Sequence, residues 1–479
     1  MRRGKSNGSA NHAEGGPRER EERVGYRALT ALVAALSVLA AGAGHWMFEV
    51  ESQLLLLGVL PPALLTTPEY YGTLAAVRRL GRAGVRVAIA HSSSLGVAAF
   101  SRYVAERYGC PPTEDSTRFI DWLCGHGKTR KPHVLCATSD DTVWLYARHR
   151  ERLSRYYKVS PNSVETIYAL LNKRRLSELC QRVGIDTPEV WSPESQGDLA
   201  RVAREAPFPL MIKPVTQILF ESRSKGAVVR DRRELLERYP RFARQRYGQA
   251  ITAFDPQVTR PLLQEYFPEA AEGIYNLSGF IDESGSSLAV RASVKVLQHP
   301  RHLGVGLCFE DAPVKTELVD KIAALCREVG YSGVFEVEFI RAGGRVMMID
   351  FNPRFYNQMV FDIARGLDLA LLSYYSALGD GPAVQKVLDS ARKERRHGPR
   401  AHLHRLNFEI MLRAQRFSGA LSSMEERNWR RWHGLHGDQC TDAAHDPSDW
   451  LPGVMDAARN VYGYLRHPRA FIRTIVLNR

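Results

Sequence analysis

The chain has 479 residues, and at roughly 100–200 residues per domain this length corresponds to about two to four domains. Hydrophobic residues make up 44% and charged residues 25%, which is typical of a soluble globular protein and argues against disorder except at the ends. The net charge of +14 suits a polyanionic ligand, a nucleic acid or an anionic membrane surface, but no zinc-finger, RNP or basic-zipper pattern occurs, so we expect no nucleic-acid partner.

Residues 1–46 are predicted to be a disordered tail followed by an apolar segment. Residues 1–24 are polar, and residues 28–44 form an apolar run of 17 residues rich in Ala and Gly. This length lies at the lower limit of a membrane span, which needs about 17–25 residues. Three interpretations stay open: a signal peptide, a signal anchor, or an extension before a true start at Met47. A signal anchor would associate the protein with a membrane through residues 28–44.

The pattern of residues 47–160 predicts an open α/β domain. Residues 54–60 form a continuous apolar run, which is typical of a buried parallel strand, and helical and strand patterns alternate after it. A GxGxxG dinucleotide fingerprint is absent. The other expected elements are helices at 74–83, 116–123 and 141–152, and strands at 85–90 and 133–137.

Residues 161–380 are predicted to form an α+β domain, because helices alternate there with strands that turns connect. Residues 381–479 are basic and mostly helical, with a role that the sequence does not reveal. The expected strands are 209–214, 227–230, 262–267, 275–282, 287–294, 334–340 and 346–351, and the expected helices are 173–183, 232–239, 406–416 and 454–466.

The segment with the strongest chemical pattern is 333–358, GVFEVEFIRAGGRVMMIDFNPRFYNQ. Strand alternation puts Glu336 and Glu338 on one face, and a Gly-Gly turn returns the chain so that Asp350 and Asn352 lie beside them. Such oxygen ligands suit Mg²⁺, with Mn²⁺ as an alternative. Arg354 follows at once and can reach a phosphate or a carboxylate with two hydrogen bonds. The competing interpretation is a solvated hairpin face.

Nucleotide-binding candidates precede this hairpin. Lys213 stands in an apolar strand, where a buried ammonium needs an anionic partner, although a strand-end Lys can also reach solvent. Lys225 lies in a polar loop that could cover phosphates or be a plain turn. The strand end at 264–267 could present its backbone to an adenine edge, and Glu272 could hold a ribose hydroxyl pair.

The order of these segments resembles the ATP-grasp superfamily, most closely its carbamoyl-phosphate-synthase-like and carboxylate–amine-ligase-like members. The resemblance covers 47–380 and implies a pre-ATP-grasp α/β domain followed by a two-lobed ATP-grasp domain. It implies that Lys173 and Lys213 contact phosphates. The implied adenine site is Gln264, Glu265, Tyr266 and Phe267, the ribose ligand is Glu272, and the Mg²⁺ ligands are Glu338, Asp350 and Asn352.

The sequence also departs from the family pattern. Asp350 stands where the family usually has Glu, so a bound metal must lie closer to the backbone. Bulky or polar residues at 355–358 replace the small residues that often follow the arginine. The family pattern therefore does not predict the acceptor pocket.

The resemblance implies an ATP-dependent ligase that converts a carboxylate to an acyl phosphate, which an amine then attacks. Arg354, Arg291 and Lys295 are the candidates for the catalytic cations, and His299 and His302 could line the entry, although a surface loop is favoured for both. Two alternatives stay open. One is a non-catalytic nucleotide-binding scaffold of a membrane or envelope assembly, and the other is biotin-dependent carboxylation.

The cysteine pattern bears on the compartment. The seven cysteines are scattered and include no CxxC, which argues against a disulfide framework and a zinc site and favours a reducing cytoplasm. We therefore expect a cytoplasmic protein, membrane-associated if residues 28–44 insert. Small-molecule carboxylate and amine substrates are the expected partners, and a homo-oligomer is compatible with the sequence.

Overall fold

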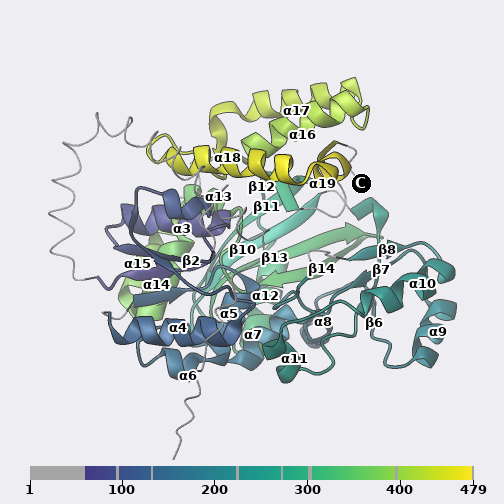
Figure 1. Ribbon diagram of the computed structural model, residues 1–479, viewed down its shortest axis with the longest axis horizontal. Coiled ribbons are helices and arrows are strands. Elements are labelled where there is room, and N and C mark those ends of the chain that lie inside the picture. Colours follow the sequence, from purple (N-terminus) through teal and green to yellow (C-terminus); the bar gives the residue numbers. More distant parts are fainter. Residues whose placement is uncertain are drawn as a thin grey trace, which may run out of the picture. The chain divides into compact units, whose positions relative to one another are not determined.

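A computed structural model describes residues 60–92, 96–130, 133–222, 226–270, 273–299, 305–393 and 398–476 (Figure 1). Several predicted features lie outside these ranges: the apolar run 28–44, most of the expected strand 54–60, Lys225, Glu272 and His302. Within the described ranges, no helix combines the length and the apolar character needed to cross a membrane.

The first sheet has five parallel strands in the order β3-β2-β1-β4-β5. This strand order reverses between β1 and β4, as in doubly wound α/β domains. The strands are β1 Ala63–Leu65, β2 Val87–His91, β3 Val104–Gly109, β4 His133–Cys136 and β5 Tyr157–Lys158, and the connecting helices are α3 Tyr71–Arg82, α4 Ser116–Lys128, α5 Asp140–Arg148 and α6 Arg150–Leu153.

Within the described residues, the first strand is β1, which follows the predicted strand 54–60. Leu60 is not in a strand, and β1 starts only after Pro61 and Pro62, which have no N–H group to donate to a sheet. The Pro62 carbonyl instead accepts a hydrogen bond of 2.8 Å from Val134 on β4.

The second sheet is small and antiparallel, with the order β6-β9-β7-β8. Its strands are β6 Val190–Trp191, β9 Leu262–Glu265, β7 Leu210–Lys213 and β8 Ala227–Val229. One face packs against α9 Gln196–Glu205 and α10 Arg232–Phe242, whose buried residues form a separate core with Leu210 and Leu263. Helices α7 Val164–Leu171, α8 Lys173–Arg182 and α11 Gln249–Phe254 lie toward the first sheet in Figure 1.

The third sheet has seven strands in the order β14-β13-β10-β11-β12-β15-β16. Five of these strands belong to the region that precedes residue 380: β10 Ile274–Ile281, β11 Leu288–His299, β12 Val305–Ala312, β13 Gly333–Ala342 and β14 Arg345–Asn352. Helices α12 Thr316–Val329, α13 Met359–Ala364 and α14 Leu369–Leu378 accompany them. β12, α7 and α12 were not anticipated, although the buried apolar residues of α12 recur at helical spacing.

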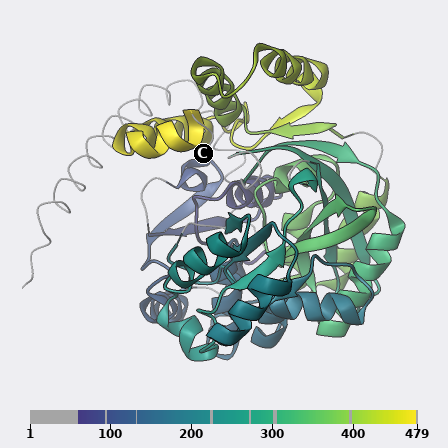
Figure 2. The ribbon, with the colours of Figure 1, turned by 90° about the vertical axis from the view of Figure 1, so that its right-hand side faces the viewer.

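The C-terminal region is mostly helical, as predicted, and it also extends the third sheet. Its helices are α15 Gly381–Lys393, α16 Arg405–Ser418, α17 Ser423–His436, α18 Leu451–Arg466 and α19 Pro468–Phe471. Strand β15, Ala401–Leu403, pairs antiparallel with β12, and β16, Cys440–Asp442, pairs parallel with β15. Figure 2 shows this region over one edge of the sheet.

The chain after β16 returns to the first sheet. Asp449, just before α18, accepts hydrogen bonds of 2.8 Å from the side chains of Arg78 and Ser101 and from the backbone N–H of Arg102. The Arg78 and Asp449 side chains are only 4% and 1% exposed, so this ion pair is shielded from water. The C-terminal region is thus joined both to the third sheet and to the first.

Candidate functional site

A cleft of about 780 Å³ lies where the three sheets meet. All three contribute to its lining, so the site exists only when the whole arrangement is assembled. The first sheet supplies residues at the start of α5, the second supplies β7 and β9, and the third supplies β11, β13 and β14. Its charged and amide side chains include Asp140, Asp141, Lys173, Lys213, Gln264, Lys295, Glu336, Glu338, Asp350, Asn352, Arg354 and Gln358.

The β13–β14 hairpin brings its polar residues together as strand alternation predicts. Glu338 lies opposite Asp350 and Glu336 opposite Asn352 in the strand register. The carboxylates of Asp350 and Glu338 are each paired with a lysine from another element. Lys173 Nζ lies 2.9 Å from Asp350 Oδ1, and Lys295 Nζ lies 2.5 Å from Glu338 Oε1. The cleft thus places three acidic groups and two ammonium groups within one small region.

Lys173 is held in place by the start of α8. The Asn172 side chain caps the helix by accepting hydrogen bonds from the backbone of Arg174 and Arg175, so Lys173 is the first helical residue. Burial lowers the pKa of Lys173, but Asp350, Asp140 and Glu338 raise it by more, so the net pKa lies above the ordinary value. The ammonium therefore stays charged at neutral pH.

Glu336 is the most buried acid of the hairpin, with 3% of its surface exposed. Its carboxylate accepts hydrogen bonds from Asn352 Nδ2 at 2.6 Å and from Gln358 Nε2 at 2.9 Å. Burial, and then the neighbouring Glu338, raise the pKa of Glu336 to about 7. The hydrogen bond to Asn352 turns the amide oxygen away from Glu336 and toward Arg354, whose guanidinium donates to it at 2.9 Å.

Arg354 joins the hairpin to the first sheet. Its Nε donates to Asp140 Oδ1 at 2.6 Å. Asp140 is the first residue of α5, which Ser139 and Thr142 cap reciprocally. Sequence analysis missed Asp140 and Asp141, although their place after β4, at the carboxyl end of a parallel strand, is the usual position for binding residues in such sheets. Glu336 was placed on the right face but not among the candidate ligands.

On the opposite wall, the predicted nucleotide residues of the second sheet line the cleft. Lys213 Nζ donates to Gln264 Oε1 at 3.0 Å, across the paired strands β7 and β9. Gln264, Glu265, Tyr266 and Phe267 all line the same wall. Lys213 is the last residue of β7, and the buried or half-buried residues 264–267 lie at the end of β9 and just after it.

Two catalytic candidates have different environments. Lys295 lines the cleft, but Arg291 lies outside it, because its guanidinium donates to the backbone carbonyls of Arg365 and Ala391 beneath α13 and α15. The strand alternation of β11 gave both residues the same face, and helix α13 covers only the part of that face near Arg291. The backbone of His299 ends β11, and its side chain is outside the described residues.

The donor set fits a hard divalent cation in one specific way. Among the described residues, no three Asp, Glu, His or Cys side chains are gathered so that they could hold a metal by themselves. Glu338, Asp350 and the Asn352 amide supply two carboxylates and one neutral oxygen, which is the partial set that Mg²⁺ takes when phosphate oxygens complete its coordination. These residues therefore fit a metal bound together with a phosphate ligand.

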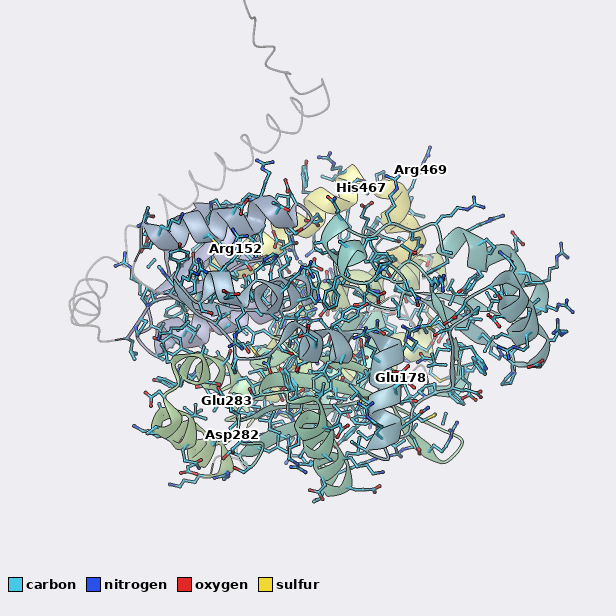
Figure 3. The ribbon with its side chains drawn as sticks, turned by 90° about the horizontal axis from the view of Figure 1, so that it is seen from below. Arg152, Glu178, Asp282, Glu283, His467 and Arg469 are labelled. Atoms are coloured by element: carbon cyan, nitrogen blue, oxygen red, sulfur yellow. The ribbon has the colours of Figure 1, made fainter. Side chains whose placement is uncertain are left out.

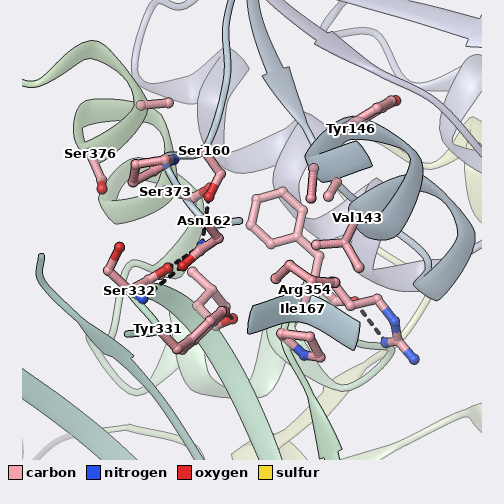
Figure 4. Close-up of a pocket in the computed structure, with 18 of the residues that line it drawn as sticks. Val143, Tyr146, Ser160, Asn162, Ile167, Tyr331, Ser332, Arg354, Ser373 and Ser376 are labelled. Atoms are coloured by element: carbon pink, nitrogen blue, oxygen red, sulfur yellow. Dashed lines mark hydrogen bonds between the residues drawn. The ribbon is translucent and has the colours of Figure 1, made fainter. Parts of the chain in front are cut away.

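A much smaller cavity of about 70 Å³ lies behind Arg354 (Figure 4). Asn162 spans it by donating to Ser160 Oγ and to the Ser332 carbonyl, both at 2.7 Å, while accepting from the Ser332 N–H at 3.0 Å. These bonds attach the start of β13 to the segment after β5. The cavity is therefore part of the junction that orients the hairpin.

Comparison with known proteins identifies the fold. No family model matches the chain. The formate-dependent phosphoribosylglycinamide formyltransferase of Sulfurisphaera tokodaii is 23% identical over 50% of this chain and 58% of its own length. The carbamoyl phosphate synthase large chain of Thermus thermophilus is 27% identical over 44% of this chain and 20% of its own length.

Solved structures show a wider likeness. The biotin carboxylase domain of the Hydrogenobacter thermophilus 2-oxoglutarate carboxylase, in complex with MgADP and bicarbonate, superimposes with a TM-score of 0.53 at 16% identity, over 67% of this chain and 70% of that one. The L-amino acid ligase of Bacillus licheniformis gives 0.52 at 14% identity, over 68% and 77%. The chain has the ATP-grasp fold. The predicted fold class is confirmed.

One buried acid of the ATP-grasp cleft leads to a pH prediction. Burial raises the pKa of Asp141 to about 7, although the Leu219 N–H, at 2.6 Å from Oδ1, favours the charged form. The folded state therefore binds a proton that the unfolded state has lost, and the free energy of unfolding should fall as pH rises from about 4 to about 7, by at most about 1.4 kcal/mol per pH unit. Asp141→Asn should make this slope shallower in urea unfolding without removing it, because Glu336 contributes a slope of the same sign, and an unchanged slope would contradict the assignment.

Proposed function

We propose that this chain is an ATP- and Mg²⁺-dependent ligase that activates a carboxylate as an acyl phosphate for attack by an amine. The observation that carries the proposal is the meeting, in one cleft, of Lys173, Lys213 and Lys295 with the oxygen ligands of the β13–β14 hairpin. The chain spans 58% and 20% of the length of the curated relatives named above, so the activity is argued from the site itself.

The proposed nucleotide site follows the two rims of the cleft. Lys213 and Lys173 would contact phosphate oxygens, and the backbone at 264–267 would bind the adenine edge. Glu338, Asp350 and Asn352 would hold Mg²⁺ (or Mn²⁺), and the bound metal would neutralise negative charge on the phosphates. Lys173 and Lys295 now pair with two of these acids, so both ammonium groups are already positioned beside the place where the phosphates would lie.

The chemistry at the other end of the cleft needs cations rather than covalent groups. A carboxylate oxygen attacks the γ-phosphorus and ADP leaves, and then the amine nitrogen attacks the acyl carbon, phosphate leaves and the amine loses a proton. Arg354 and Lys295 would stabilise the negative charge that develops on the phosphoryl and acyl oxygens. Asp140 holds the Arg354 guanidinium in place for this role, as the hydrogen bond of 2.6 Å indicates.

The proposed substrates are a small-molecule carboxylate and a small-molecule amine, in keeping with the likeness to an amino-acid ligase. Biotin carboxylases share the fold, but carboxylation would make bicarbonate the carboxylate and a biotin nitrogen the amine. A screen of both substrate classes by phosphate release separates the two chemistries. A cytoplasmic location is part of the same proposal, since ATP is available in the cytoplasm. The proposal also includes a homo-oligomer.

The first test is the thermal stability of the protein with and without Mg-ATP. Ligand at about a hundred times its Kd should add roughly 2.7 kcal/mol to the free energy of unfolding. Lys213→Ala and Asn352→Ala should each lose most of this gain, while Lys321→Ala, at a partly exposed lysine paired with Glu317 on α12, should keep it. If millimolar Mg-ATP does not stabilise the parent, the proposed enzyme activity is contradicted and a scaffold role is favoured.

A further inference from the structure

Exposed apolar residues are concentrated in the C-terminal region. Of the eleven large hydrophobic residues that are exposed in the described part of the chain, eight lie between positions 417 and 472. Four of them belong to α18 or its N-cap: Trp450, Val454, Val461 and Leu465, with exposed fractions of 46%, 46%, 52% and 76%. The proposed ligase site does not use any of them.

These residues share one face of α18, opposite the face that packs against the rest of the chain. At about 100° per residue, Val454, Val461 and Leu465 lie within about 40° of one another. Met455 and Asp456, on the other side, are 2% and 1% exposed, and Asp456 accepts a hydrogen bond of 2.8 Å from Tyr71 of α3. The inner face therefore anchors the helix to the first sheet, and the outer face is an apolar stripe without a partner in the described structure.

The charges around the stripe are of one sign. Asp456 is the only acidic residue between positions 450 and 476, and it is buried against Arg459 at 3.2 Å. Arg466, His467 and Arg469 at the end of the helix are exposed, and Figure 3 shows His467 and Arg469 at the outer edge of the molecule. An apolar helix face with cationic residues beside it is the pattern of helices that lie in the interface of an anionic bilayer.

The size of the stripe argues against a second copy as the occupant. A helix of 16 residues is about 24 Å long, and a stripe about 10 Å wide covers roughly 240 Å². A stable interface needs about 800 Å² per partner. A bilayer needs no matching surface of that size, because apolar side chains insert individually.

We propose that α18 docks the protein on an anionic membrane surface, with Trp450, Val454, Val461 and Leu465 in the apolar layer and Arg466 and Arg469 at the lipid head groups. No residue of α18 lines the cleft, so we expect binding to leave the proposed ligase chemistry unchanged. The proposal is independent of the apolar run 28–44, which lies outside the described residues.

The test is sedimentation of the full chain with vesicles of phosphatidylcholine alone or mixed with phosphatidylglycerol. The parent should bind only the anionic vesicles, and less at high salt. The double variant Val461→Asn/Leu465→Asn should lower the bound fraction roughly tenfold or more. Leu236→Asn, at a 37% exposed position on α10, is the matched control and should bind like the parent. Thermal stability reports whether each variant is folded.

Quenching by brominated lipid identifies the bound part of the chain. The Trp450→Phe variant should lose the quenching seen in the parent, whereas contact through the N-terminal run would keep it, because Trp46 follows that run. Retained quenching, retained binding of the double variant, or absence of binding to anionic vesicles would each overturn the proposal. So would self-association of the parent that the double variant abolishes, since a second copy would then cover the stripe.

Discussion

Replacing Asp449 with alanine is expected to lower the free energy of unfolding by about 3–5 kcal/mol, the usual cost of breaking a buried ion pair by removing one partner. The reason is the Arg78 guanidinium, which is 4% exposed and would lose its only carboxylate partner shown here. Ser101 and the Arg102 N–H would lose an acceptor at the same time. Urea unfolding of the parent and the variant measures the difference.

Two further variants sharpen this experiment. Arg82→Ala removes a neighbouring ion pair, to Asp446, whose arginine is 40% exposed, and should cost no more than about 1 kcal/mol. The double variant Arg78→Met/Asp449→Ala should be more stable than Asp449→Ala alone, because it no longer buries an unpaired charge. If Asp449→Ala costs as little as Arg82→Ala, the buried pair does not hold the C-terminal region to the first sheet.

Replacing Arg354 with alanine is expected to lower the rate of substrate-dependent phosphate release by about 10²–10³-fold, the usual cost of losing one preorganised donor to a developing negative charge. The guanidinium is fixed by Asp140 on one side and Asn352 on the other, so it needs no reorganisation during the reaction. Arg354→Lys should recover little of the rate, because an ammonium cannot reproduce the two-sided contact.

The stabilisation by Mg-ATP separates catalysis from nucleotide binding in this variant. Arg354→Ala should keep most of the stabilisation by Mg-ATP, since Lys173 and Lys213 would still contact the phosphates. Asp140→Asn preserves the shape of the partner but not its charge, and should give an intermediate rate. A rate for Arg354→Ala within a few-fold of the parent would show that the arginine is structural only.

The hairpin was predictable because its information is local. Alternation fixed the shared face of Glu338 and Glu336, and a Gly-Gly turn fixed the register that pairs them with Asp350 and Asn352. Arg291 was a catalytic candidate but lies outside the cleft, because a strand pattern cannot show which part of a face a distant helix covers. Asp140 was missed for a related reason: its contact with Arg354 joins residues 214 positions apart.

The C-terminal strands were equally invisible in the sequence. β15 and β16 have three residues each, too few to show a period, and they form because β12 offers an unpaired edge. Their position in the third sheet depends on tertiary pairing rather than on local preference. Helices α16 and α18 of the same region were predicted from their periodic patterns, whereas α15 and α17 were not.

This edge pairing has a practical meaning for any attempt to isolate the part of the chain that resembles the ATP-grasp superfamily. A fragment that ends at residue 380 would leave the edge of β12 unpaired at Cys308, Phe309 and Glu310, where β15 now pairs with it. Exposed edges of this kind add strands from other molecules, and such a fragment is expected to aggregate. We therefore expect the C-terminal region to be needed for the solubility of the preceding part of the chain, because it covers part of this strand edge.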